Sequence, residues 1–221
     1  MTTLIFAIHF EDAYHLNDGA VGERKLGMKV SKDVMANHKE QIVKVAARRF
    51  RERGFDGISV ADIMNEAGLT HGGFYRHFSS KDELIAISAL RAASETIAKW
   101  QKIADDATGD RLEAVVHSYL SLRHHDHPET GCLVAALGGE LSRQPPAVKD
   151  AVTDAGRQMI DFLSGIAPGK TKALRRKQAI VVLASMAGGM ILARMTSDSE
   201  LREEILKNVA HAVPNSVSAT V

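Results

Sequence analysis

The feature that most constrains the fold of this chain is a series of helix signals with very little sequence between them. The first is a set of apolar residues at the i, i+3, i+4, i+8 spacing of an amphipathic helix, followed by a glycine. The apolar residues are Ile42, Val45, Ala46 and Phe50, and the glycine is Gly54. They predict a helix from about Ala36 to Arg53.

Two short helices are predicted directly after it. Ser59 occupies an N-cap position and Asp62 follows three residues later, as in a capping box, and the helix that they open ends at Gly68. Thr70 can cap the next helix, which we expect from His71 to about Phe78. Two short helices joined by a tight turn have the layout of a helix-turn-helix.

The second of these short helices contains residues that disfavour a helix. Gly72 and Gly73 each cost about 1 kcal/mol relative to alanine. Phe74 and Phe78, four residues apart, would turn one face inward. The opposite face then carries His71, Gly72, Tyr75 and Arg76. Because glycine lets a backbone approach a phosphate closely, we interpret this segment as a DNA-recognition helix, the alternative being a loop with incidental glycines.

The distribution of charge supports a polyanionic partner for this part of the chain. The whole sequence has a formal net charge of +1, but residues 28–81 hold ten basic and six acidic side chains. A solvated, charged helix face would give a similar excess. Within this segment, Thr70, Tyr75, His77 and Lys81 offer donors that suit phosphate. Arg76 can pair with a guanine or with phosphate and solvent, and its place beyond the first turn favours the second.

Residues 37–84 resemble the DNA-binding domain of TetR-type transcriptional regulators. The resemblance depends on Ala46–Phe50 with Gly54-Phe55, on Ser59–Ile63, on Ala67–Thr70 and above all on Gly72–Lys81. It implies that Ser59, Thr70, Tyr75, His77 and Lys81 bind backbone phosphates and that His71 and Gly72 lie over the major groove. It also implies a C-terminal helical domain that binds an effector and dimerises.

The rest of the sequence predicts further helices and no strands, so we expect an all-α fold. An S-x-x-E box at Ser80 and Glu83 opens a long helix towards Ala104. Proline, glycine and serine residues then separate the expected helices 111–125, 132–143, 147–166, 172–195 and 200–212. The predicted organisation is a disordered or weakly ordered arm (1–35), a helix-turn-helix domain (36–80), a helical effector and dimerisation domain (81–213) and a frayed tail (214–221).

The predicted helix 172–195 is apolar on all sides, which favours burial both in its own subunit and against a second copy. Its most apolar run, Ala179–Ala193, is too short to cross a membrane, and Leu4–Ile8 is a poor signal peptide. The residues that could line an effector pocket, or simply form core, are Trp100, Tyr119, Cys132, Met159, Phe162 and Met186.

The only cysteine, Cys132, excludes an internal disulfide and suits a reducing cytoplasm. Its place at a predicted helix start favours the thiolate, so it is either a reactive sensor or an inert thiol. The stretch Gly131–Arg143 also resembles a TetR subgroup in which some members sense electrophiles through cysteine. The nearby sequence His124-His125-Asp126-His127 is interpreted as a polar turn rather than a metal site.

These observations predict a cytoplasmic, nucleoid-associated homodimer that represses transcription from a pseudo-palindromic DNA operator until a small-molecule effector releases it. A constitutive DNA-binding protein without an effector is the first alternative. An α-helical enzyme is the second, although no catalytic residues and no cofactor are identified. Residues 1–27 are absent from the native protein if translation starts at Met28.

Overall fold

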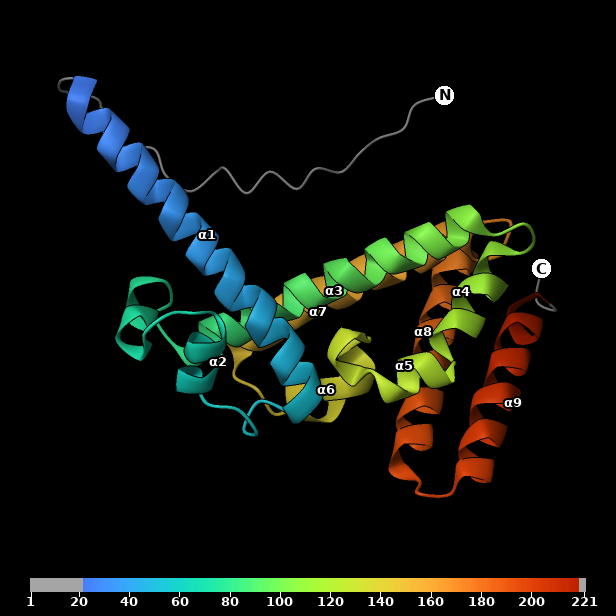
Figure 1. The fold of residues 1–221 in the computed structure, drawn as a ribbon. Coiled ribbons are helices and arrows are strands. Elements are labelled where there is room, and N and C mark those ends of the chain that lie inside the picture. Colours follow the sequence, from blue (N-terminus) through green and yellow to red (C-terminus); the bar gives the residue numbers. More distant parts are fainter. Residues whose placement is uncertain (1–21, 219–221) are drawn as a thin grey trace. The chain divides into compact units, whose positions relative to one another are not determined.

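The computed structural model describes residues 22–218, with side chains from Lys32 to Val217, and all regular elements in this range are helical (Figure 1). The all-α prediction is therefore confirmed. The elements are α1 (Gly22–Arg53), α2 (Val60–Glu66), the 3-10 helix η1 (His71–Arg76), α3 (Lys81–Asp106), α4 (Arg111–Tyr119), α5 (Leu122–Asp126), the 3-10 helix η2 (Pro128–Thr130), α6 (Leu133–Leu141), α7 (Pro146–Ile166), α8 (Lys172–Met195) and α9 (Ser199–Ser218). Residues 38–221 form one compact unit.

Several helix boundaries differ from those predicted. The expected helix 111–125 is two helices, because the chain turns at Leu120 and Ser121 then caps α5 by accepting a hydrogen bond from the His124 N–H at 3.3 Å. Helix α1 begins at Gly22 rather than near Ala36, and α9 continues through Pro214 to Ser218. The division into four segments stays a prediction, and its residues 1–21 and 219–221 lie outside the described part of the chain.

Two hydrophobic cores hold residues 38–217 together. The first, which we call the N-terminal core, joins α1, α2, η1 and the first half of α3, and its largest fully buried side chains include Phe50, Phe74 and Phe78. The second, the C-terminal core, lies between the second half of α3 and helices α4, α7, α8 and α9. Burying a side chain of this size stabilises the fold by about 1.5–3 kcal/mol.

Helix α6 contributes to both cores. Leu133, Leu137 and Leu141 repeat every four residues and lie on one face of the helix, which belongs to the N-terminal core. Cys132 and Ala135 face the C-terminal core instead. A segment more than fifty residues beyond the predicted helix-turn-helix therefore completes the hydrophobic core of that domain.

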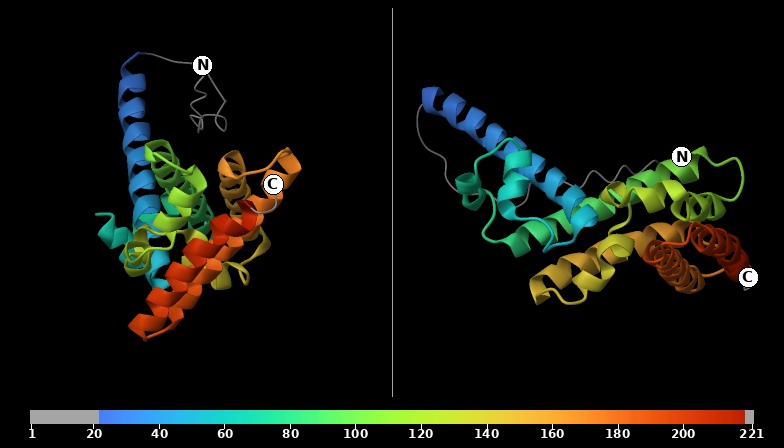
Figure 2. Two further views of the ribbon diagram at one scale, coloured as in Figure 1. Left: turned by 90° about the vertical axis from the view of Figure 1, so that its right-hand side faces the viewer. Right: turned by 60° about the horizontal axis from the view of Figure 1, so that its bottom comes forward.

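Helices α8 and α9 pack side by side (Figure 2). By length and composition α8 would pass as a membrane span, but Ala179, Val182, Met186 and Met190 are completely buried in the C-terminal core. This is the pattern of a core helix. The opposite side of the pair exposes large apolar side chains, namely Ile180, Val181, Ile191, Leu192, Met195 and Leu201.

Candidate nucleic-acid interface and effector cavity

The capping box predicted at the start of α2 is present. Ser59 Oγ accepts a hydrogen bond from the Asp62 N–H at 3.1 Å, and an Asp62 carboxylate oxygen accepts bonds from the Ser59 N–H at 3.2 Å and the Ser59 hydroxyl at 2.6 Å. These bonds hold the pKa of Asp62 below its usual value. The Ser59 hydroxyl proton is thus already directed to a carboxylate, although the side chain is exposed.

The second short helix is present as the 3-10 helix η1 rather than as an α-helix. Its first turn closes through a bond of 2.9 Å from the Gly73 N–H to the Thr70 carbonyl, and the Thr70 side chain forms no capping hydrogen bond, which corrects the predicted cap. Phe74 and Phe78 are 1% and 2% exposed, and their rings stack at 5.5 Å between centroids. Two buried aromatic anchors therefore hold a segment with weak helix propensity.

The outer face of η1 is polar, and its polar atoms have no partner in the described part of the chain. His71, Tyr75 and Arg76 are exposed, and within residues 32–217 none of their side chains makes a hydrogen bond or ion pair. Tyr75 is 73% exposed, and the edge contact of its ring with Phe74 at 5.2 Å fixes its direction. The predicted division into an inner and an outer face is therefore observed.

Gly72 is unnecessary for the fold. A Cβ atom placed on it would meet nothing within 4 Å, and its φ lies outside the left-handed region that favours glycine. Gly68, in contrast, has φ of 73° in the turn before η1, where a side chain would be strained. The missing side chain at position 72 therefore leaves open space on the exposed face.

His77 and Lys81 lie at the edge of this face and are only partly exposed. Burial lowers the pKa of His77, and the positive charges of His38, Lys39 and Arg76 lower it further. Lys81 Nζ donates hydrogen bonds inward, to the carbonyl oxygens of Phe55 and Ile58. Lys81 thus holds the loop between α1 and α2, a role that the sequence pattern did not reveal.

Other cations of the basic segment are neutralised within the protein. Arg48 and Arg49 both pair with Glu66, and Arg49 also pairs with Glu52. Lys39 lies over the Phe78 ring, 5.3 Å from its centroid, and forms no ion pair within the described residues. Lys44 and Arg53 of α1 also form no ion pair within the described residues, so the uncompensated positive charge lies on α1 as well as around η1.

A cavity of about 360 Å³ lies between α3, α4, α5 and the segment Thr130–Cys132. Three of the six residues predicted to line a pocket do so, namely Trp100, Tyr119 and Cys132. Phe162 packs against the Trp100 ring at 5.9 Å between centroids but is not part of the wall. Met159 and Met186 are completely buried core residues away from the wall.

Cys132 is 1% exposed, and burial raises the pKa of its thiol. The N–H groups of Val134 and Ala135 at the start of α6 act in the opposite direction but do not outweigh burial. The expectation that this helix start favours the thiolate is therefore wrong. The thiol is protonated at neutral pH.

His124 is a structural residue that the sequence pattern did not reveal. Its Nδ1 bonds to the Tyr119 carbonyl at 2.7 Å, so Nδ1 carries the proton, and Nε2 accepts a bond from the Cys132 N–H at 2.9 Å. Burial lowers the pKa of His124 to about 4. The neighbouring histidines have other partners: His125 bonds to Asp126 and His127 to Glu129.

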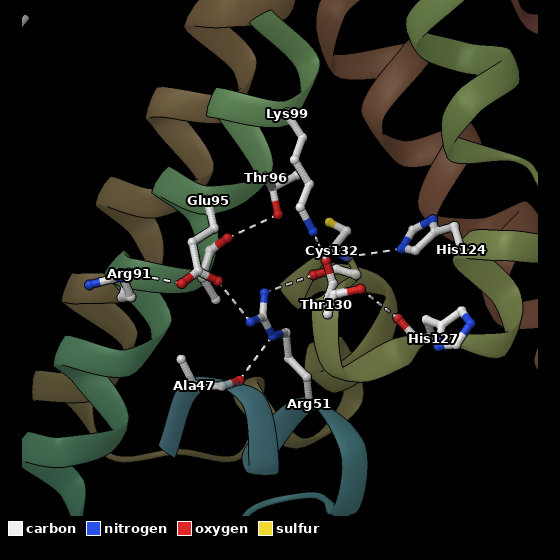
Figure 3. A network of polar contacts seen from close by, with 12 residues as sticks. Ala47, Arg51, Arg91, Glu95, Thr96, Lys99, His124, His127, Thr130 and Cys132 are labelled. Carbon is white, nitrogen blue, oxygen red and sulfur yellow. Dashed lines mark hydrogen bonds and ion pairs between the residues drawn. The ribbon is translucent and has the colours of Figure 1, made fainter. Parts of the chain in front are cut away.

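A buried arginine links the cavity wall to the DNA-binding part of the molecule (Figure 3). From the last turn of α1, Arg51 donates to the Gly131 carbonyl at 3.0 Å, to Glu95 of α3 at 2.9 Å and to the Ala47 carbonyl at 2.9 Å. At the other end of α6, Glu140 accepts a bond from the Phe55 N–H at 2.7 Å. Both ends of α6 are thus hydrogen-bonded to α1 or the loop that follows it.

Comparisons with known proteins agree with this arrangement. A family model described as bacterial regulatory proteins, tetR family, matches residues 42–86, and one described as tetracyclin repressor-like, C-terminal domain, matches residues 108–209. A stretch of 96 residues is 26% identical to the HTH-type transcriptional repressor KstR2 of Mycolicibacterium smegmatis, and it covers 42% of this chain and 47% of that relative, so the chain spans about half of the relative's length.

Two further similarities extend over both parts of the chain. The HTH-type transcriptional regulator LmrA of Bacillus subtilis is 28% identical over 166 residues, which cover 72% of this chain and 87% of the relative. The reduced form of NemR from E. coli has the same fold, with a TM-score of 0.66 at 20% identity, over 80% of this chain and 95% of that one.

Proposed function

Because this chain belongs to the tetR family of bacterial regulatory proteins and is a DNA-binding transcriptional regulator, we propose that it represses transcription as a homodimer and that a small-molecule effector releases it from its operator. The repressor KstR2 among its relatives supports this sign of regulation. We further propose a cytoplasmic location on the nucleoid, with no catalytic activity and no cofactor.

The observation that carries the proposal is the unpartnered outer face of η1. Its donors, from His71, Tyr75 and Arg76, have no ligand within the described residues, and the open space at Gly72 lets the backbone approach the DNA. We assign Thr70, Tyr75, Arg76 and His77 to backbone phosphates, and His71 and Gly72 to the major groove. Lys81 contributes through its one remaining N–H donor, and Ser59 contributes by turning its hydroxyl proton from Asp62 to the phosphate, since each already has partners inside the protein.

The exposed apolar side chains of α8 and α9 support the homodimer. Several large apolar side chains exposed on one helix pair favour association, and a second copy packed on them would form a four-helix contact. A two-fold dimer presents two η1 segments to a pseudo-palindromic operator, with half-sites about 34–36 Å apart or a related spacing.

We propose that the effector occupies the cavity beside Trp100, Tyr119 and Cys132. Its wall at Gly131 is hydrogen-bonded to Arg51 of α1, so a ligand that displaces this wall changes the position of the DNA-binding domain. An Arg51→Met variant is expected to bind DNA but to respond less to the effector.

Fluorescence anisotropy with DNA from upstream of the protein's own gene tests the proposal. Wild-type protein should select one fragment, with an affinity that falls steeply as salt rises. Gly72→Ala should bind this fragment about tenfold more weakly, since the added methyl group fills the gap at the DNA. The same change should leave the fold intact or stabilise it by up to about 1 kcal/mol, because alanine favours a helix.

Gly156→Ala in α7 is the matched control, because a Cβ there also meets nothing within 4 Å. It should bind DNA as the wild type does. The absence of any preferred fragment at low salt would overturn the proposed function, and wild-type affinity of Gly72→Ala would remove Gly72 from the interface.

A further inference from the structure

The charged side chains in the wall of the proposed effector cavity are all basic. Three basic side chains, Lys99, Lys102 and Arg123, contribute to the wall, and the wall contains no aspartate or glutamate. Within residues 32–217, none of the three forms an ion pair. The nearest carboxylates, Glu95 and Glu129, act on Lys99 from outside the wall, so the lining itself is cationic and attracts an anion.

The floor of the cavity is aromatic and largely buried. The Trp100 and Tyr119 rings lie 6.0 Å apart between centroids, and both residues are 3% exposed. The Tyr119 hydroxyl is buried, and its neighbour within the described residues is the Cys132 thiol, which is a weak hydrogen-bonding group. A buried hydroxyl with only a weak partner is costly, so a ligand atom that bonds to it would relieve that cost.

Lys99, one of the three basic residues, also contacts the Thr130–Cys132 segment of the wall. Its ammonium donates to the Thr130 carbonyl. Burial and the positive charges of Arg51 and Arg123 lower the pKa of Lys99, and Glu95 and Glu129 act in the opposite direction. An anion beside Lys99 stabilises that charge and competes with the Thr130 carbonyl for it. The next carbonyl, that of Gly131, is the one held by Arg51.

On this basis, and resting on the proposed function, we propose that the effector is a small organic anion. Its apolar or aromatic body lies on Trp100 and Tyr119, and its carboxylate or similar group lies between Lys99, Lys102 and Arg123. A cavity of about 360 Å³ is of the size that holds a small organic molecule.

The single tryptophan of the chain, Trp100, lies in the cavity and makes the test direct. Titration of wild-type protein with 4-phenylbutyrate and with its neutral analogue 4-phenylbutyramide, followed by Trp100 fluorescence, compares ligands that differ in charge. We expect the carboxylate to bind about tenfold more tightly, and this preference to shrink as salt rises. Equal affinities, or no change of Trp100 fluorescence with either compound, would overturn the proposal.

Two variants test whether the basic residues of the cavity wall cause the preference for the carboxylate. In a Lys102→Gln/Arg123→Gln double variant, whose changes fall on exposed side chains, the preference for the carboxylate should fall to about threefold or less. Lys149→Gln, at an exposed lysine of α7, is the control and should keep it. A preference that persists in the double variant would also overturn the proposal. These titrations contain no DNA, so a failure of the anisotropy experiment would not change their outcome.

Discussion

Helices η1 and α6 are both short, but the structure uses them in opposite ways. η1 is attached to the protein by one apolar side, through Phe74 and Phe78, and its polar side makes no hydrogen bond or ion pair within the described residues. α6 is attached at more points: its leucines belong to the N-terminal core, Glu140 near its end bonds to the loop after α1, and Gly131 just before it bonds to Arg51 of α1. The surface proposed to contact DNA must stay free, whereas a segment proposed to transmit effector binding must be bonded to the helix that it displaces.

The largest expected effect is a difference in the free energy of unfolding between substitutions on the buried and on the exposed side of η1. Phe74→Ala should lower the free energy of unfolding by about 3–5 kcal/mol, because it leaves a cavity in the N-terminal core. Tyr75→Ala, one residue later but 73% exposed, should change it by less than about 0.5 kcal/mol while weakening DNA binding. Urea denaturation of both variants checks this, and similar losses of stability would contradict the division of η1 into an anchored and a free side.

The attachment of α6 is tested at Gly131, which lies just before the helix and next to His124. An alanine at Gly131 would place its Cβ 2.5 Å from His124 Nε2, and two hydrogen bonds prevent the His124 ring from moving aside. Gly131→Ala should therefore destabilise the protein by about 1–3 kcal/mol. Gly139→Ala, inside α6 with open space around it, is the control and should be neutral or stabilising. Equal denaturation midpoints for the two variants would show that the contact with His124 is not tight.

The burial of His124 also makes the stability of the protein depend on pH. His124 has a pKa of about 4 in the folded protein and about 6.5 when unfolded, so below pH 6.5 the unfolded state binds more protons. This residue should therefore contribute a loss of about 2 kcal/mol as the pH falls from 7 to 5. Chemical denaturation at both pH values measures it. A His124→Gln variant, less stable at pH 7, should lose this part of the slope, and an unchanged slope would place the titration elsewhere.

A smaller effect is expected at the DNA surface, with the opposite pH preference. Burial and the charges of His38, Lys39 and Arg76 lower the pKa of His77 in the free protein, and a phosphate beside it would raise that pKa again. DNA binding then takes up a proton, so affinity should rise by about threefold between pH 7.5 and 6. Anisotropy titrations of wild type and His77→Gln measure the difference, and identical pH profiles would remove His77 from the phosphate contacts.

The sequence predicted η1 well because its determinants are local. Caps, glycine stops and the spacing of Phe74 and Phe78 all act within one or two turns, and the outward residues follow from the same spacing. The 3-10 geometry of η1 was missed, since the loss of α-helical bonds at Gly72-Gly73 depends on how the two phenylalanines pack. The cavity was half predicted, because its wall is assembled from α3, α4, α5 and Thr130–Cys132, and no local pattern fixes which apolar residues meet there.

Arg51 and His124 escaped prediction for a related reason. In the sequence, Arg51 is one of several basic residues on a helix, and only its distant partners, Glu95 and Gly131, distinguish it from the others. The thiol of Cys132 was predicted to be acidic from its place at a helix start. The effect of the surrounding core, which excludes water from the sulfur, is larger than that of the helix start.

The leucines of α6 have a practical consequence for exchanging parts between regulators. A chimera that joins the first 80 residues of this chain to the effector domain of a relative would replace the face formed by Leu133, Leu137 and Leu141 with foreign side chains. Such a hybrid has mismatched side chains in the N-terminal core, to which η1 is anchored. A hybrid that takes both the N-terminal residues and α6 from this chain keeps the native contacts of that core. The unit that can be exchanged between regulators therefore consists of two segments that are separate in the sequence.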